Sequence, residues 1–94
     1  MPLTVKFIGA LRHLSGKTQF TTNFQEELSI RGLLEKISQE IPELKRTFCD
    51  QELNDSRSNS LILVNGREIS VLNGFETKLS DGDEIVFVPV IHGG

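Results

Sequence analysis

The feature that most constrains this sequence is one amphipathic helix with strand-like segments on both sides of it. Five apolar residues recur at the spacing of a single helix face, namely Ile30, Leu33, Leu34, Ile37 and Ile41. Ser29 is a favoured N-cap residue and Pro42 cannot continue a helix, so we expect a helix that begins after Ser29 and ends near Ile41. With no second long helix to pack against, this helix must cover one face of one sheet.

Two segments before the helix alternate in the manner of half-buried strands. Residues 3–8 place Leu3, Val5 and Phe7 on one side, and residues 17–24 place Thr18, Phe20, Thr22 and Phe24 on one side. Residues 9–16, which connect them, have apolar residues at the spacing of a single helical turn. Because the two segments are close in sequence, we expect them to pair as an antiparallel hairpin.

Further strands are expected after the helix. Residues 50–60 are polar and indicate an exposed loop, whereas Leu61–Val64 is apolar on both sides, which favours a central strand. Asn65-Gly66 is a strong tight-turn signal, so residues 67–71 should return beside that strand. Residues 85–88 are again apolar on both sides, and this last strand fits best beside the first one, in the interior of the sheet.

The order of elements is therefore strand, strand, helix, strand, strand, strand, which predicts an α+β fold. We interpret it as the β-grasp arrangement, a mixed sheet of about four to five strands with one main helix on one face. Pro89 cannot donate to a β-ladder and should lie where pairing ends. We accordingly expect a single domain over residues 1–88 and a flexible C-terminal tail over residues 89–94.

Charge and cysteine content argue against several classes of function. Ten basic and thirteen acidic residues give a net charge of −3, which argues against a nucleic-acid partner and is compatible with docking on a basic protein. The single cysteine, Cys49, can form neither an internal disulfide nor a zinc site, and a small buried residue is a better interpretation than a nucleophile.

The sequence also argues against a metal-binding protein and against a membrane protein. The acidic residues Asp81, Asp83 and Glu84 lack the spacing of a calcium loop, so we interpret them as a turn and predict no metal site. No apolar run approaches the roughly 20 residues that cross a bilayer, and the N-terminus has no signal-peptide pattern. We expect a cytoplasmic protein without a membrane partner.

The tail is the strongest candidate for a functional site. Gly93 and Gly94 have no side chains, so they could thread a narrow channel of another protein and present a terminal carboxylate there. A carboxylate is a poor electrophile until it is joined to AMP, and this chain has no Gly-x-x-x-x-Gly-Lys-Ser/Thr loop to bind ATP. Activation must therefore come from a partner enzyme. The alternative is a frayed, inert terminus.

Three segments, together with the terminal glycine pair, carry a resemblance to a known family. They are residues 5–16 (VKFIGALRHLSG), residues 64–69 (VNGREI) and residues 79–89 (LSDGDEIVFVP). Over nearly its full length the chain resembles the MoaD-type small subunit of molybdopterin synthase. More broadly, it resembles the ThiS-like and ubiquitin-like sulfur carriers and small modifiers. The usual tail pattern is Phe-Pro-Pro-Val-x-Gly-Gly, from which residues 88–94 (VPVIHGG) depart by one proline and the aromatic residue.

The resemblance implies a non-enzymatic carrier that binds no cofactor itself. A ubiquitin-activating-like enzyme would use ATP to convert Gly94 to an acyl adenylate and then to a thiocarboxylate. The sulfur would serve molybdopterin biosynthesis together with the large subunit of molybdopterin synthase. Two alternatives remain: an archaeal-type modifier joined through Gly94 to lysines of target proteins, and an interaction domain with an inert tail.

Strand parity predicts a partner-binding surface beside the tail. If Leu3, Val5 and Phe7 face the helix, the outward residues Ile8, Val86 and Val88 form an apolar patch on the helix-free face. Arg12, at a position that matches the family, would meet an acidic group of a partner. The tail residues expected to contact a partner are Pro89, Val90, Ile91 and His92. For His92 a general-base role is conceivable, but a contact in the partner's channel is the better interpretation.

Overall fold

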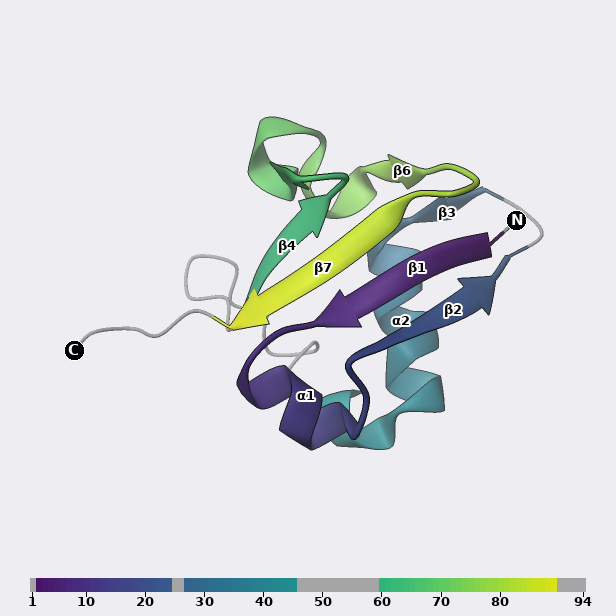
Figure 1. The fold of residues 1–94 in the computed structure, drawn as a ribbon. Coiled ribbons are helices and arrows are strands. Elements are labelled where there is room, and N and C mark those ends of the chain that lie inside the picture. Colours follow the sequence, from purple (N-terminus) through teal and green to yellow (C-terminus); the bar gives the residue numbers. More distant parts are fainter. Residues whose placement is uncertain (1, 25–26, 46–59, 90–94) are drawn as a thin grey trace.

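The computed structural model describes residues 2–24, 27–45 and 60–89 of the 94-residue chain. Five strands form the main sheet in the order β2-β1-β7-β4-β5. Their bounds are β1 Pro2–Phe7, β2 Gln19–Asn23, β4 Ser60–Val64, β5 Arg67–Glu68 and β7 Glu84–Pro89. The long helix α2 (Ile30–Glu40) lies against one face of this sheet, and α1 (Ala10–Ser15) lies at one end of it (Figure 1).

The sheet is mixed, as the sequence predicted. β1 pairs antiparallel with β2 and parallel with β7, and β7 pairs antiparallel with β4. The last strand of the chain therefore lies in the middle of the sheet, directly beside the first. The predicted β-grasp arrangement is confirmed, with α2 as the main helix on one face.

Alternation along the two central strands separates a buried face from an outer one. Leu3, Val5 and Phe7 of β1 are all buried, and so are Ile85 and Phe87 of β7. The Phe7 ring stacks between two others, with centroids 5.8 Å from Phe20 and 5.7 Å from Phe87. Burial of a large apolar side chain contributes about 2 kcal/mol, so this aromatic row fixes the register of β1, β2 and β7.

The helix begins and packs as its sequence predicts. The Ser29 hydroxyl accepts a hydrogen bond of 3.2 Å from the Gly32 amide, which is an N-cap interaction. The five residues of the predicted apolar stripe are all buried. Gly32 has a packing reason to lie inside the helix, since a β-carbon there would lie 2.8 Å from Leu28 Cδ1.

Several short elements differ from the prediction. A two-stranded ladder joins β3 (Leu28–Ser29) to β6 (Lys78–Leu79), and pairs this short leave no periodic signal in the sequence. The predicted return strand over residues 67–71 is shorter, because β5 gives way to a 3₁₀ turn, η3 (Ile69–Val71). Two further 3₁₀ turns are η1 (Pro42–Leu44) and η4 (Gly74–Glu76).

Other predictions are confirmed or fall outside the described residues. Asn65 and Gly66 both have positive φ, 51° and 87°, as the predicted tight turn between β4 and β5 requires. The predicted polar loop over residues 50–60 lies outside the described residues except for Ser60, which begins β4, and Cys49 lies outside them as well. Among the described residues, no helix is long and apolar enough to cross a membrane.

Candidate functional site

The outer face of the sheet carries apolar side chains where β7 ends. Ile8, directly after β1, is 44% exposed, and its backbone N–H donates to the Phe87 carbonyl at 3.0 Å. Val86 and Val88 point away from the core and are half-buried. The three residues predicted to form an apolar patch therefore lie on neighbouring strands, on the face that α2 leaves uncovered (Figure 1).

Strand β4 enlarges this surface. Leu61 pairs with Val88 and Leu63 with Val86, while Ile62 between them is buried against the core. Leu61 is 38% exposed and Leu63 is half-buried. We call the resulting surface the outer apolar patch, defined by Ile8, Leu61, Leu63, Val86 and Val88. The sequence analysis missed the two leucines because a run that is apolar on both sides does not reveal which residues share a face with β7.

Pro89 is the last residue of β7 and lies opposite Ser60. It also lies against Gly9, the N-cap residue of α1, which has φ 62° and ψ −135°. A β-carbon built on Gly9 would lie 3.0 Å from Pro89 Cγ and 3.6 Å from Cδ. The strand end that leads to the tail is thus held against the corner between β1 and α1.

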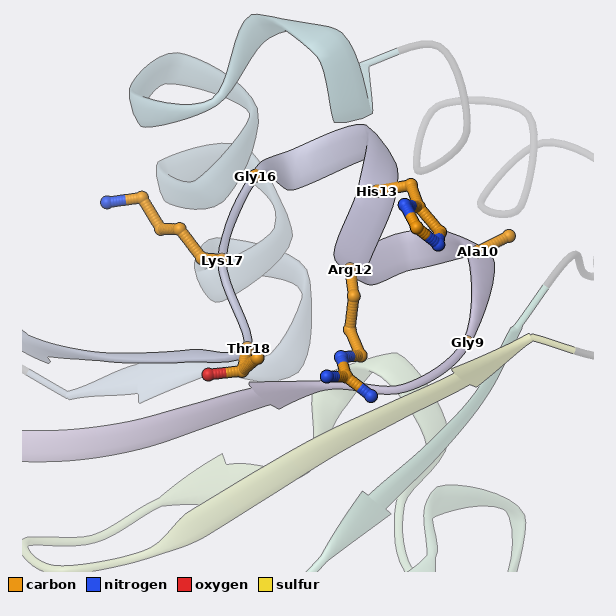
Figure 2. Close-up of a pocket in the computed structure, with 7 residues that line it drawn as sticks. All are labelled: Gly9, Ala10, Arg12, His13, Gly16, Lys17 and Thr18. Carbon is orange, nitrogen blue, oxygen red and sulfur yellow. The ribbon is translucent and has the colours of Figure 1, made fainter.

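A hollow with a basic lining lies beside that corner (Figure 2). Its lining consists of Gly9, Ala10, Arg12, His13, Gly16, Lys17 and Thr18. Figure 2 shows the guanidinium of Arg12 directed back toward the strands and the Lys17 ammonium pointing away from Arg12. The Lys17 ammonium lies 5.6 Å from the centroid of the Phe20 ring. Arg12 was predicted to bind a partner, and the lining of the hollow adds His13 and Lys17, which are also exposed.

Three of the cations elsewhere on the surface are paired with carboxylates within the chain. Lys6 pairs with Glu84 at 2.8 Å and Arg31 with Glu76 at 2.8 Å. Within the described ranges, the side chains of Arg12 and Lys17 have no carboxylate partner. In a chain of net charge −3, the hollow thus offers positive charge to an acidic group of another molecule.

A third ion pair joins Lys78 to Glu27 at 2.7 Å. The hydrogen bond from Lys78 and its positive charge hold the pKa of Glu27 below its usual range. Both side chains are well exposed, so this pair contributes little to stability.

The acidic segment at the other end of β7 forms a turn, as predicted, and hydrogen bonds within the chain stabilise it. Asp83 accepts hydrogen bonds from the Asn65 side chain at 2.9 Å and from the Ser80 amide at 2.7 Å. The Asn65 side-chain oxygen in turn accepts from the Glu84 amide at 2.9 Å. In the part of the chain that the structure describes, no cluster of three or more His, Cys, Asp or Glu could hold a metal ion.

Except for Pro89, which the structure places as the last residue of β7, the predicted tail residues lie outside the described residues. These are Val90, Ile91, His92, Gly93 and Gly94, so the structure locates the point from which they continue, Pro89. What the described residues bring together is the end of β7, the outer apolar patch and the basic hollow. These three features surround the base of the predicted tail.

Comparison with known proteins places this arrangement in a family. The sequence matches the model of the ThiS family over residues 5–94. The chain is 24% identical over 94 residues to small archaeal modifier protein 3 of Haloferax volcanii, and the match covers 100% of both chains. The match to the family model includes Gly93 and Gly94.

Solved structures agree on the fold. The chain is similar to Urm1 from Trypanosoma brucei with a TM-score of 0.78 and 27% identity, covering 99% of this chain and 95% of that one. It is similar to a putative molybdopterin converting factor, subunit 1, from Pyrococcus furiosus with a TM-score of 0.76 and 23% identity, covering 97% and 99% of the two chains. This chain therefore belongs to the ThiS family, ubiquitin-like β-grasp proteins that act as small carriers or modifiers and are not enzymes by themselves.

Proposed function

We propose that this chain is a sulfur carrier whose Gly94 carboxylate is activated by a partner enzyme and converted to a thiocarboxylate. The observation that carries the proposal is the ThiS family match, which runs through the terminal Gly93-Gly94 pair. The structure supports it by placing the end of β7 beside an apolar patch and a basic hollow, both accessible to a partner.

The chemistry requires two transfers, the first at the α-phosphorus of ATP and the second at the acyl carbon of Gly94. A carboxylate oxygen of Gly94 attacks the α-phosphorus of ATP, pyrophosphate leaves, and a mixed anhydride with AMP remains. A sulfur nucleophile such as hydrosulfide then attacks the acyl carbon, AMP leaves, and a proton is released as the thiocarboxylate forms. The partner enzyme binds ATP, while this chain presents the acid.

In this proposal, the described residues dock the chain on its partner enzyme. The outer apolar patch provides a desolvated centre of contact, and burial of such a centre dominates the affinity of protein interfaces. The basic hollow with Arg12 and Lys17 provides a charged rim, which favours an acidic partner and speeds association. Val90, Ile91 and His92 would line the partner's channel, and the two glycines would reach its reaction centre.

For the sulfur acceptor we propose the pterin precursor of the molybdenum cofactor, with the large subunit of molybdopterin synthase as the second partner. The support is the fold shared with a putative molybdopterin converting factor, subunit 1. The chain would dissociate from the activating enzyme and offer the thiocarboxylate to this second partner through the same face.

A protein modifier is the second candidate, and the relative named small archaeal modifier protein 3 favours it. Activation would be the same, but a lysine amine of a target protein would attack the acyl carbon and form an isopeptide bond. Both functions are compatible with one activated tail.

Intact-mass measurement tests the carrier proposal. The full chain is incubated with the adenylating enzyme of its own organism, ATP and sodium sulfide, and the expected result is the mass increase of one oxygen replaced by sulfur. An unchanged mass with an enzyme that releases pyrophosphate on the chain would overturn the carrier function. A search for Gly-Gly remnants on lysines of cellular proteins, with a strain lacking Gly94 as control, tests the modifier function.

A further inference from the structure

We propose that Gly9 is a positioning residue for the C-terminal tail, because the absence of its side chain lets the Pro89 ring lie against the corner between β1 and α1. This inference rests on the proposed function, since it concerns how the carboxylate of Gly94 is delivered. Gly9 lies in the loop after β1, about 80 residues before Pro89 in the sequence, yet the two are neighbours in the fold.

The first observation is the closeness of the approach. A β-carbon on Gly9 would lie 3.0 Å from Pro89 Cγ, closer than carbon atoms pack at their optimal separation. Any other residue at position 9 would therefore require the proline ring or the corner itself to move by a few tenths of an ångström. Gly74, the first residue of η4, also has positive φ, but a β-carbon there would meet nothing within 4 Å.

The second observation is that Gly9 lies between two interactions that fix the corner. On one side, the Ile8 amide donates to the Phe87 carbonyl at 3.0 Å, which ties the corner to β7 two residues before Pro89. On the other side, the Gly9 carbonyl accepts from the Arg12 amide at 3.0 Å, which forms the first turn of α1. The backbone at Gly9 adopts φ 62° and ψ −135° to meet both, a conformation that glycine tolerates best.

The third observation is the geometry of the remaining chain. Five residues follow Pro89, and fully extended they reach at most about 17 Å. Over that length, each change of about 10° in the direction of the chain at Pro89 displaces the far end by about 3 Å, using the same reach per residue. Catalytic groups are sensitive to displacements of about 1 Å. A fixed position of Pro89 therefore reduces how far the partner enzyme must reorient the chain that follows it.

The contact predicts a specific kinetic effect. Docking depends on the outer apolar patch, which Gly9 does not form, and at the basic hollow on the charged side chains of Arg12 and Lys17, so a methyl group at position 9 leaves the KM for the carrier within about 2-fold. Misdirection of the tail lowers the kcat of pyrophosphate release by about 10-fold, since orientation of the reacting group is lost. The effect on kcat should be absent when the proline ring is absent.

Four variants of the full chain form the test: Gly9→Ala, Pro89→Ala, the double variant, and Gly74→Ala as the matched control. We expect Gly9→Ala to lose about 10-fold in kcat and Pro89→Ala about 3-fold, with the double variant no worse than Pro89→Ala alone. Backbone strain at position 9 is present in both Gly9→Ala and the double variant, so a loss caused by strain alone persists in the double variant, whereas a loss caused by the contact with the proline ring does not. Gly74→Ala should retain the kcat of the wild-type chain.

A structural readout accompanies the kinetics. Hydrogen exchange of the Ile8 amide reports whether β7 stays against the corner, and we expect faster exchange in Gly9→Ala and restored protection in the double variant. If Gly9→Ala does not fold, Pro89→Ala and the double variant still test the contact.

Several outcomes would overturn the inference. They are a normal kcat in Gly9→Ala, equal losses in Gly9→Ala and Gly74→Ala, or additive losses in the double variant. Failure of the proposed function looks different, because the wild-type chain would then release no pyrophosphate while the exchange of the Ile8 amide still responded to the two substitutions.

Discussion

The two ends of β7 differ in how far their polar and charged groups are paired within the chain. At the Glu84 end, the Asn65 side chain donates to Asp83, both side chains accept from backbone amides, and Lys6 pairs with Glu84. At the Pro89 end, Ile8 and Leu61 are exposed. Within the described ranges, Arg12 there has no carboxylate partner. The first end closes the fold, and the second presents apolar and cationic groups to another molecule.

This contrast separates stability from binding along a single strand. Substitutions at the Glu84 end should lower the free energy of unfolding without changing the affinity for a partner. Substitutions at the Pro89 end should lower that affinity with little change in the free energy of unfolding. Polar groups that already have partners gain little from an interface, whereas exposed apolar area gains from any contact that removes it from water.

The largest effect is expected from removing Gly94. The truncated chain should show a loss of activation of at least about 100-fold, because its last carboxylate no longer reaches the reaction centre. Its unfolding temperature should match that of the full chain. Pyrophosphate release and thermal unfolding measure the two properties, and normal activation of the truncated chain would remove the tail from the proposal.

Leu61→Asp should weaken binding to the activating enzyme by about 2 kcal/mol, because it places a charge within the outer apolar patch. Val71→Asp is the matched control, since Val71 is 72% exposed but lies outside that patch. Isothermal titration calorimetry measures both affinities. Equal losses in the two variants would show that the patch is not the docking surface.

Asn65→Ala should destabilise the fold by about 1–2 kcal/mol, because it removes the side-chain hydrogen bonds to Asp83 and to the Glu84 amide. Alanine also tolerates the positive φ at this position less well than asparagine does. Binding to the activating enzyme should be unchanged. Urea denaturation with a parallel binding titration checks the prediction. A large loss of affinity with little loss of stability would contradict the division between the two ends.

Arg12→Glu should weaken binding by about 1 kcal/mol and make the affinity less sensitive to salt, because a charge on the rim of an interface acts mainly on the association rate. Arg67→Glu carries the same charge change at an exposed position of β5 and should have no such effect. Association rates at two ionic strengths measure the difference. A salt dependence that is identical in both variants would exclude the basic hollow from docking.

The smallest effect concerns pH and the Glu27–Lys78 pair. The pKa of Glu27 is lowered in the folded chain, so its contribution to stability is present above the usual glutamate pKa of about 4.3 and is lost as the pH falls through the folded-state value. Glu27→Gln should therefore differ from the wild-type chain at neutral pH and converge with it in acid. Thermal unfolding from neutral to acidic pH measures this difference in stability, and a difference that grows in acid would contradict the prediction.

Much of the fold could be predicted because its signals are local. Ser29 and Pro42 delimit α2, the alternation in β1 separates buried from exposed residues, and Asn65-Gly66 forms its turn. The three patch residues Ile8, Val86 and Val88 followed from the same parity. The ladder between β3 and β6 did not, because two residues per strand carry no period.

The sequence by itself determined the class of the fold, the buried face of each long element and the candidate tail. These depend on periodicity, on capping residues and on the order of segments, all of which act over a few residues. Only the tertiary structure decided that Leu61 and Leu63 complete the patch, and that Pro89 lies against Gly9. Strand register and contacts across about 80 residues arise from packing of the whole core, which no local pattern encodes.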